Sequence, residues 1–173
     1  MKIRVLFVFT TLCISVMISK AQDSIEIEAY AQFQNYSIDN VIIKGFSDSL
    51  FIKDITAFEF EGKQYSFRKV RRRVQLLQDS NLKYEMGGGI RGEIFDWKGN
   101  KIGKTSKKNN KSLEDFEGEN LALIKLAPNK NGVQINIILS KDDPELALLL
   151  VYHRLEYYRN KKIADETVFF VFF

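Results

Sequence analysis

Apolar and polar residues alternate along much of the chain after residue 24, and this pattern predicts half-buried strands. Ile25, Ile27 and Ala29 share one face while Glu26 and Glu28 share the other, the period-two arrangement of a strand with one face in a core. Similar short runs, separated by turn residues, lie at 41–46, 50–60, 64–67, 82–86 and 92–97. Their spacing predicts an antiparallel meander and not alternating βαβ units.

Turn residues between apolar runs predict two further hairpins, which turn at 98–100 and at 128–132. Two stretches are harder to assign. Residues 65–78 fit strands better than an amphipathic helix, although Phe67, Val70, Val74 and Leu77 also have helical spacing. Residues 104–119 are polar and predict a surface loop with at most a helical turn after Ser112.

One helix is predicted at about 143–160. Asp143 suits the N-cap, Pro144 fits the first helical position, and Glu145 favours the positive end of the helix dipole. Residues 146–152 are apolar around the whole circumference, and polarity returns only from His153 onward. Because a surface helix would show one apolar stripe, the sheet is expected to close into a barrel around this helix. The predicted fold is mainly β, with this hydrophobic near-C-terminal α-helix inside.

The last residues predict one more strand. Residues 168–173 are all apolar, and we expect a strand at about 167–173. An exposed apolar strand promotes aggregation, so this one should be paired or docked.

The first 21 residues predict a cleavable signal peptide. Lys2 and Arg4 form a basic region, 5–18 is largely apolar, and Ser19 and Ala21 supply the small residues of a cleavage site. This apolar run is shorter than the roughly 20 residues that span a bilayer. The expected mature chain, 22–173, is therefore a single exported domain, periplasmic or secreted from a bacterial cell, without a transmembrane span.

Cleavage changes the charge and the chemistry that are available. Removing Lys2, Arg4 and Lys20 from a chain with 26 basic and 22 acidic residues leaves 23 bases, a net charge near +1. This balance does not favour a nucleic-acid partner. Cys13, the only cysteine, leaves with the signal peptide, so the mature chain can form neither a disulfide nor a cysteine metal site.

The meander, the hairpin GEIFDWKGNKIGK and the segment NIILSKDDPELALLLVYHRLEYY resemble the tubby C-terminal-like superfamily, which includes the phospholipid scramblase-like and LURP-one-related domains. The resemblance covers roughly 60–160 and implies a closed barrel around a hydrophobic helix, and with it a lipid or membrane role. The chain departs from the family pattern by continuing after the helix with KKIADETVFFVFF.

Motifs for catalysis and cofactors are weak. Gly87, Gly89 and Gly92 match a dinucleotide fingerprint, but a strand follows where a helix is needed. Gly99 lies one residue too close to Gly103 for a phosphate loop. His153 is the only histidine, which excludes a multi-histidine metal site, and we expect it to be structural. No metal or cofactor is predicted, and the chain is not expected to be an enzyme.

The densest charge cluster is basic, and we interpret it as a surface that binds anionic groups. Bases near an anionic membrane each contribute about 1 kcal/mol to binding. The partners expected are anionic lipid headgroups or another envelope protein. The leading hypothesis is a non-catalytic exported binding or structural protein; the alternatives are a lipocalin-like carrier of an apolar ligand and a carboxylate-dependent hydrolase. The residues of the cluster are Arg68, Lys69, Arg71, Arg72 and Arg73.

Overall fold

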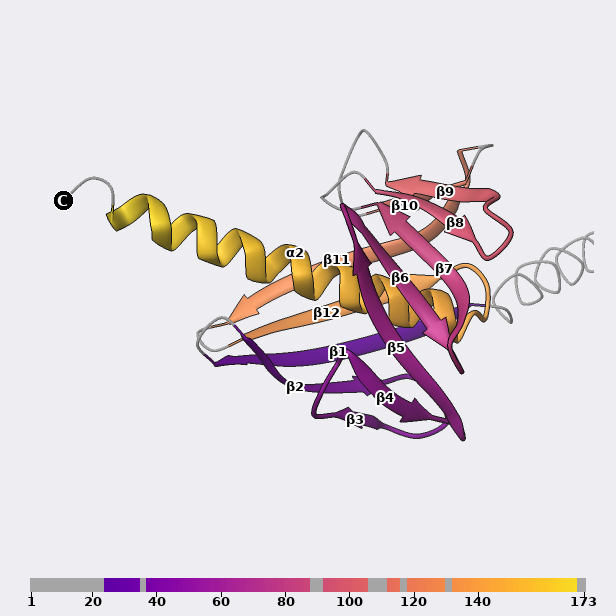
Figure 1. Cartoon of the computed structure of the whole chain (residues 1–173), viewed down its shortest axis with the longest axis horizontal. Helices are drawn as coiled ribbons and strands as arrows, with labels where there is room; N and C mark the ends of the chain where they lie inside the picture. The colour runs from indigo at the N-terminus through magenta and orange to yellow at the C-terminus, as the bar shows by residue number, and fades with distance from the viewer. Residues whose placement is uncertain are drawn as a thin grey trace, which may run out of the picture.

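The computed structural model describes residues 24–34, 37–87, 92–105, 112–115, 118–129 and 132–170. One antiparallel sheet of 12 strands curls around a single helix (Figure 1). The predicted signal peptide lies outside the described residues. The first six strands are β1 (Ile25–Gln34), β2 (Ser37–Lys44), β3 (Leu50–Ile52), β4 (Ala57–Phe60), β5 (Lys63–Val70) and β6 (Arg73–Gln78).

The other six strands are β7 (Asn81–Gly87), β8 (Glu93–Asp96), β9 (Lys101–Thr105), β10 (Ser112–Glu114), β11 (Asn120–Asn129) and β12 (Gly132–Leu139). The strands follow one another as a meander from β4 to β12, and β12 then pairs with β1, which continues to β2 and β3. The sheet therefore comes round nearly to its start, and β3 and β4 are its two edges.

The seam between β3 and β4 is covered by side chains from β4 and from neighbouring turns. The rings of Phe46 and Phe60 pack with centroids 4.7 Å apart. Ser47 Oγ donates a hydrogen bond of 3.4 Å to Glu61 Oε1. Contacts across the gap thus join two edges that share no ladder among the described pairings.

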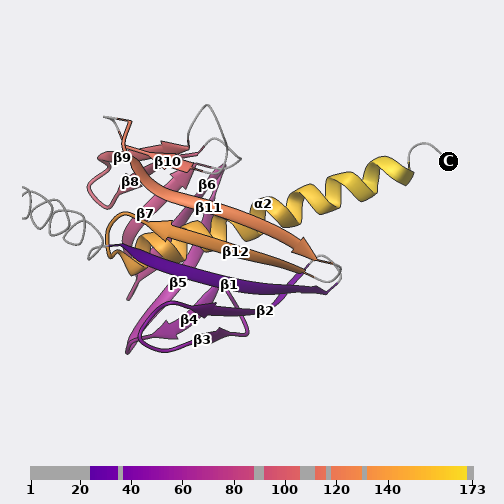
Figure 2. The same cartoon turned by 180° about the vertical axis from the view of Figure 1, so that it is seen from behind.

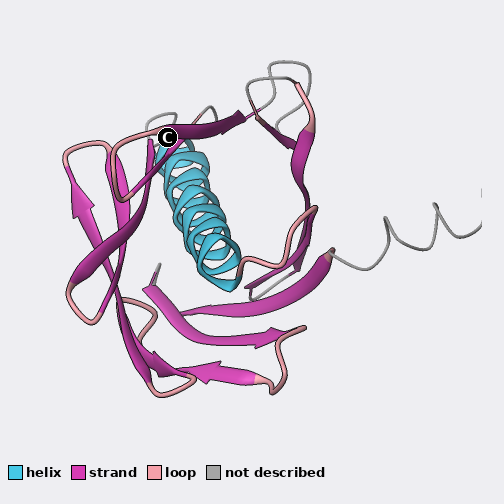
Figure 3. Ribbon diagram, turned by 90° about the vertical axis from the view of Figure 1, so that its right-hand side faces the viewer, coloured by secondary structure: helices cyan, strands magenta, loops and turns pink. Residues whose placement is uncertain are grey.

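Helix α2 (Pro144–Phe170) runs along the barrel axis, and the strands encircle it in the end-on view of Figure 3. It packs against β12, β1 and β2 on one side and against β6 and β7 on the other. From behind, β11, β12 and β1 lie across the helix, and its C-terminal part extends past the barrel (Figure 2). A helix of 27 residues is about 40 Å long, so only part of it fits inside.

The enclosure predicted from the apolar stretch is confirmed. Leu148 is 2% exposed and Leu149 is fully buried. The enclosure also continues further than expected, because His153, Arg154 and Glu156 are buried as well. Inner-face residues of the strands complete the core around the helix, among them Ile27, Leu76, Ile94, Leu113, Ile124 and Ile137.

The ambiguous stretch 65–78 is a hairpin of β5 and β6 with a two-residue loop, Arg71 and Arg72. This outcome confirms the strand assignment over the helical one. The hairpins predicted at 98–100 and 128–132 are also present, as β8–β9 and β11–β12.

Two expectations from the sequence were wrong, one about residues 112–114 and one about the C-terminal tail. Ser112–Glu114 forms β10 and pairs with β9 and β11, where a surface loop with at most a helical turn was expected. Residues 167–170 continue α2 and are not a strand, and 171–173 lie outside the described residues. The helix continues past 160 because neither glycine nor proline follows Pro144 to interrupt it.

Candidate functional site

The N-terminal end of α2 is held to the barrel wall by paired polar groups. Leu146 N–H donates to Asp143 Oδ1 at 2.9 Å, which confirms the predicted N-cap. Tyr84 Oη donates to the other oxygen of this carboxylate at 2.6 Å. Tyr65 Oη donates to Glu145 Oε1 at 3.2 Å. Burial, followed by interactions with these two carboxylates, raises the pKa of both tyrosines, so each remains a donor at neutral pH.

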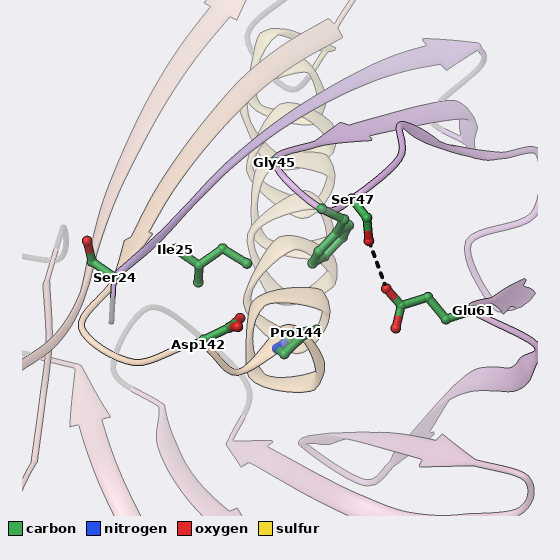
Figure 4. A pocket seen from close by; sticks show the side chains of 8 residues that line it. Ser24, Ile25, Gly45, Ser47, Glu61, Asp142 and Pro144 are labelled. Carbon is green, nitrogen blue, oxygen red and sulfur yellow. Dashed lines mark hydrogen bonds between the residues drawn. The ribbon is translucent and has the colours of Figure 1, made fainter. Parts of the chain in front are cut away.

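A pocket of about 310 Å³ lies beside this end of the helix and contains two carboxylates, Asp142 and Glu61 (Figure 4). In that view Glu61 meets Ser47, while Asp142 lies on the other side of Pro144. The two carboxylates come from opposite walls of the pocket and are not drawn together.

Alternation along β5 divides the basic cluster between the two faces of the sheet. Tyr65 and Phe67 are buried on the inner face, and Lys69 continues this face at the end of the strand. Its ammonium reaches Glu156 Oε2 of α2 at 3.5 Å. Arg68 points the other way and donates two hydrogen bonds to the side-chain oxygen of its cross-strand partner on β6.

Arg73 also belongs to the outer face. It pairs with Glu85, and its guanidinium lies 5.2 Å from the centroid of the Phe95 ring. Gln75, the residue that accepts from Arg68, donates to the same carboxylate. Arg68 and Arg73 are thus held in a network along β5, β6 and β7, and the sequence cluster is not one continuous binding surface.

Arg71 and Arg72 form the tip of the β5–β6 hairpin. Arg71 has φ of 57°, a left-handed conformation that costs a residue with a Cβ roughly 1–2 kcal/mol. In the turn between β4 and β5, φ is positive at Glu61 and at Gly62, so one of the two positions is occupied by a glycine. Both arginine side chains are exposed, and the ion pairs of the described residues include neither of them.

A pocket of about 390 Å³ lies between this hairpin and α2, at the mouth where the helix leaves the barrel. We call it the mouth pocket. Three of its residues are basic and one is acidic. Its lining residues are Lys69, Arg71, Arg72, Val74, His153, Glu156, Tyr157 and Asn160.

Glu156 is the only carboxylate in that lining, and it is already engaged. Arg159 Nη2 donates to Glu156 Oε2 at 2.7 Å, and Lys69 contacts the same oxygen. The mouth pocket therefore keeps a net positive charge, while Val74 and Tyr157 give it an apolar part. This combination suits an anionic group attached to an apolar body.

His153 belongs to the wall of the mouth pocket and is 3% exposed. Its Nε2 lies 3.2 Å from the carbonyl oxygen of Gly87, so this nitrogen carries the proton and donates. The contact ties the middle of α2 to the end of β7, as the predicted structural role requires. Local sequence patterns do not connect His153 with the basic cluster, because the two lie about 80 residues apart.

The described glycines of the two motifs lie within strands or next to them. Gly92 precedes β8, and a Cβ there would lie 2.5 Å from the carbonyl oxygen of Gly87. Glycine is thus required by close backbone approach. Gly103, Lys104 and Thr105 lie within strand β9, where a phosphate loop would need the start of a helix.

Across the described ranges, no three His, Cys, Asp or Glu side chains form a group able to hold a metal ion. None of the helices in those ranges combines the length and apolarity needed to cross a bilayer.

Comparison of the chain with protein-family models, curated proteins and solved structures gave no match.

Proposed function

We propose that this protein is a non-catalytic exported binding protein whose mouth pocket and hairpin tip engage anionic lipid headgroups at a membrane surface. The observation that carries the proposal is the arginine pair at the tip. Arg71 and Arg72 line a pocket with a net positive charge, and no salt bridge of the described residues includes either of them.

The expected strength of membrane binding depends on which basic residues are not engaged by other residues of the described chain. Arg68 and Arg73 are engaged on the outer face, and Lys69 contacts Glu156. The two tip arginines therefore provide most of the attraction, at about 1 kcal/mol each near an anionic surface. Their joint loss should lower membrane partitioning by about 30-fold, since 1.4 kcal/mol corresponds to a factor of ten.

The test is sedimentation of the mature chain with phosphatidylglycerol-containing vesicles at low salt. We expect association that decreases as ionic strength rises, because salt screens exposed charges. The double variant Arg71→Gln/Arg72→Gln should lose it. The matched control is Lys63→Gln/Lys141→Gln, which removes two exposed bases near the helix N-terminus and should bind like the wild type.

Absence of vesicle association at low salt would overturn the proposal, and so would equal loss in both double variants. Vesicles of uncharged phosphatidylcholine should not sediment the protein. Binding to them would show that apolar contacts, and not the arginine pair, drive association.

Two assignments belong to the same proposal and rest on the sequence alone. The export signal supports an envelope location, and the pattern over 60–160 supports membership of the tubby-like superfamily. The proposal does not include a lipocalin-like carrier with an open centre, because helix residues 146–152 occupy the middle of the barrel.

A further inference from the structure

A second basic group lies inside the barrel, separate from the arginine pair at the hairpin tip. Arg154 of α2 is 1% exposed. Its Nε and Nη2 are buried and have no hydrogen-bond partner among the described residues. An arginine remains protonated in proteins, even though burial lowers the pKa of this one. Buried donors of a charged group that lack acceptors are destabilising, and two nitrogens of this cation lack them among the described residues.

No carboxylate of α2 can reach this guanidinium from the same face. Glu156 is two residues away, which places it about 160° round the helix, and it already contacts Lys69 and Arg159. None of the four salt bridges between described residues includes Arg154. The neighbours one turn away on the same face are not acidic either. They are Leu150, Val151, Tyr157 and Tyr158.

The contacts of nearby helix residues show which part of the wall Arg154 faces. His153 reaches the end of β7, and the ring of Tyr158 packs on Phe33 of β1. Glu156 meets β5 on the remaining side, through its contact with a lysine. At 100° per residue, Arg154 projects between the directions of β7 and β1 and away from that of β5. It therefore points toward the wall that runs from β8 to β12.

The same turn of the helix adjoins the mouth of the barrel. Tyr157, the electrostatic neighbour of Arg154, lines the mouth pocket. His153, which precedes Arg154 in the chain, lines it as well. Arg154 does not line the mouth pocket, which lies on the β5–β6 side of the helix, so the guanidinium is close to the mouth along the helix axis but faces a different part of the wall.

We propose that Arg154 is the cationic group of an internal anion-binding site between α2 and the wall from β8 to β12, which takes a carboxylate or phosphate group. Such an oxyanion accepts two parallel hydrogen bonds from a guanidinium. It would supply acceptors for the buried nitrogens of Arg154 and would neutralise the charge in a setting of low dielectric. The site is independent of the arginine pair and does not rest on the proposed membrane role.

The test measures the thermal unfolding midpoint of the refolded mature chain with three additives: decanoate, decanol and inorganic phosphate. We expect decanoate to raise the midpoint by several degrees and decanol to leave it unchanged, because only decanoate carries the anion. A rise with phosphate as well indicates a site for free oxyanions, and a rise with decanoate alone indicates the head of an amphiphile. Equal rises with decanoate and decanol, or no rise with any additive, would overturn the proposal.

Arg154→Met tests the residue itself, since methionine keeps the unbranched stem and removes the charge. This variant should unfold at a higher temperature than the wild type without additives, and it should lose the response to anions. A variant that unfolds earlier, fails to fold or keeps the anion response would contradict the proposal. Arg159→Met is the control, because Arg159 is paired with Glu156, and it should keep the anion response.

Discussion

The two halves of α2 differ in how their polar side chains are satisfied. At the N-terminal end, Asp143 and Glu145 each accept a hydrogen bond from a tyrosine of the wall. At the mouth, Arg154 has two buried nitrogens without described acceptors, and Arg71 and Arg72 have no described carboxylate partner. The first end is built as an anchor. The end at the mouth has basic groups without described acceptors, and both proposed binding sites use these groups.

The anchored half should be far more sensitive to truncation than the half outside the barrel. Leu149→Ala removes a fully buried side chain and should lower the free energy of unfolding by about 2–5 kcal/mol. Ile163→Ala, on the same helix but 38% exposed, should change it by less than about 0.5 kcal/mol. Urea unfolding of both variants measures the difference, and equal losses would show that the barrel does not enclose the helix as described.

The tyrosine anchor should be visible in both stability and its pH dependence. Tyr84→Phe removes a hydrogen bond to a carboxylate and should cost about 1.5–3 kcal/mol. The pKa of Tyr84 is raised in the folded state. Its contribution to the free energy of unfolding is therefore complete below the unfolded pKa of about 10, and it is lost as pH rises from there through the folded pKa. Unfolding at pH 8 to 11 should therefore show a steeper decline for the wild type than for Tyr84→Phe.

Tyr157→Phe is the matched control at the mouth, where no hydroxyl hydrogen bond of Tyr157 is described. It should leave the free energy of unfolding at pH 8 nearly unchanged. If Tyr157→Phe costs as much as Tyr84→Phe, the two halves of the helix are anchored alike and the comparison fails.

Replacing Arg71 at the hairpin tip should change protein stability and vesicle binding in opposite directions. Arg71→Gly relieves a left-handed backbone position and should raise stability by about 1 kcal/mol, while it weakens vesicle association. Arg72→Gly removes the same charge at a residue without positive φ and should lower stability. Thermal unfolding separates the two variants, and a destabilised Arg71→Gly would show that the turn needs the arginine for its own structure.

The sequence is sufficient to predict the enclosed helix and most of the strands. Residues 146–152 are apolar on every side, so only a surrounding wall removes them from water. The pattern does not predict β10, because this strand has only three residues and is polar at both ends, which leaves almost no period-two signal. The apolar tail resembles a strand because Val and Phe favour strands. However, no glycine or proline stands before the tail to end the helix.

The site can be predicted only in part. The basic cluster is visible in the sequence, but its division between an outer-face network and the mouth depends on the register of β5 with β6 and of β6 with β7. Arg154 gives no signal, because a polar residue after an apolar helical stretch is ordinarily exposed. Its burial follows from how far the barrel wall extends along α2, a tertiary property that local patterns do not contain.

The most direct test of the difference between the two ends is amide hydrogen exchange of the mature chain with and without phosphatidylglycerol vesicles. We predict that vesicles slow exchange at the Arg71–Arg72 turn and leave the Glu61–Gly62 turn, near the opposite end of the barrel, unchanged. Slowed exchange at the Glu61–Gly62 turn, or no change at either turn while the protein is vesicle-bound, would contradict the account.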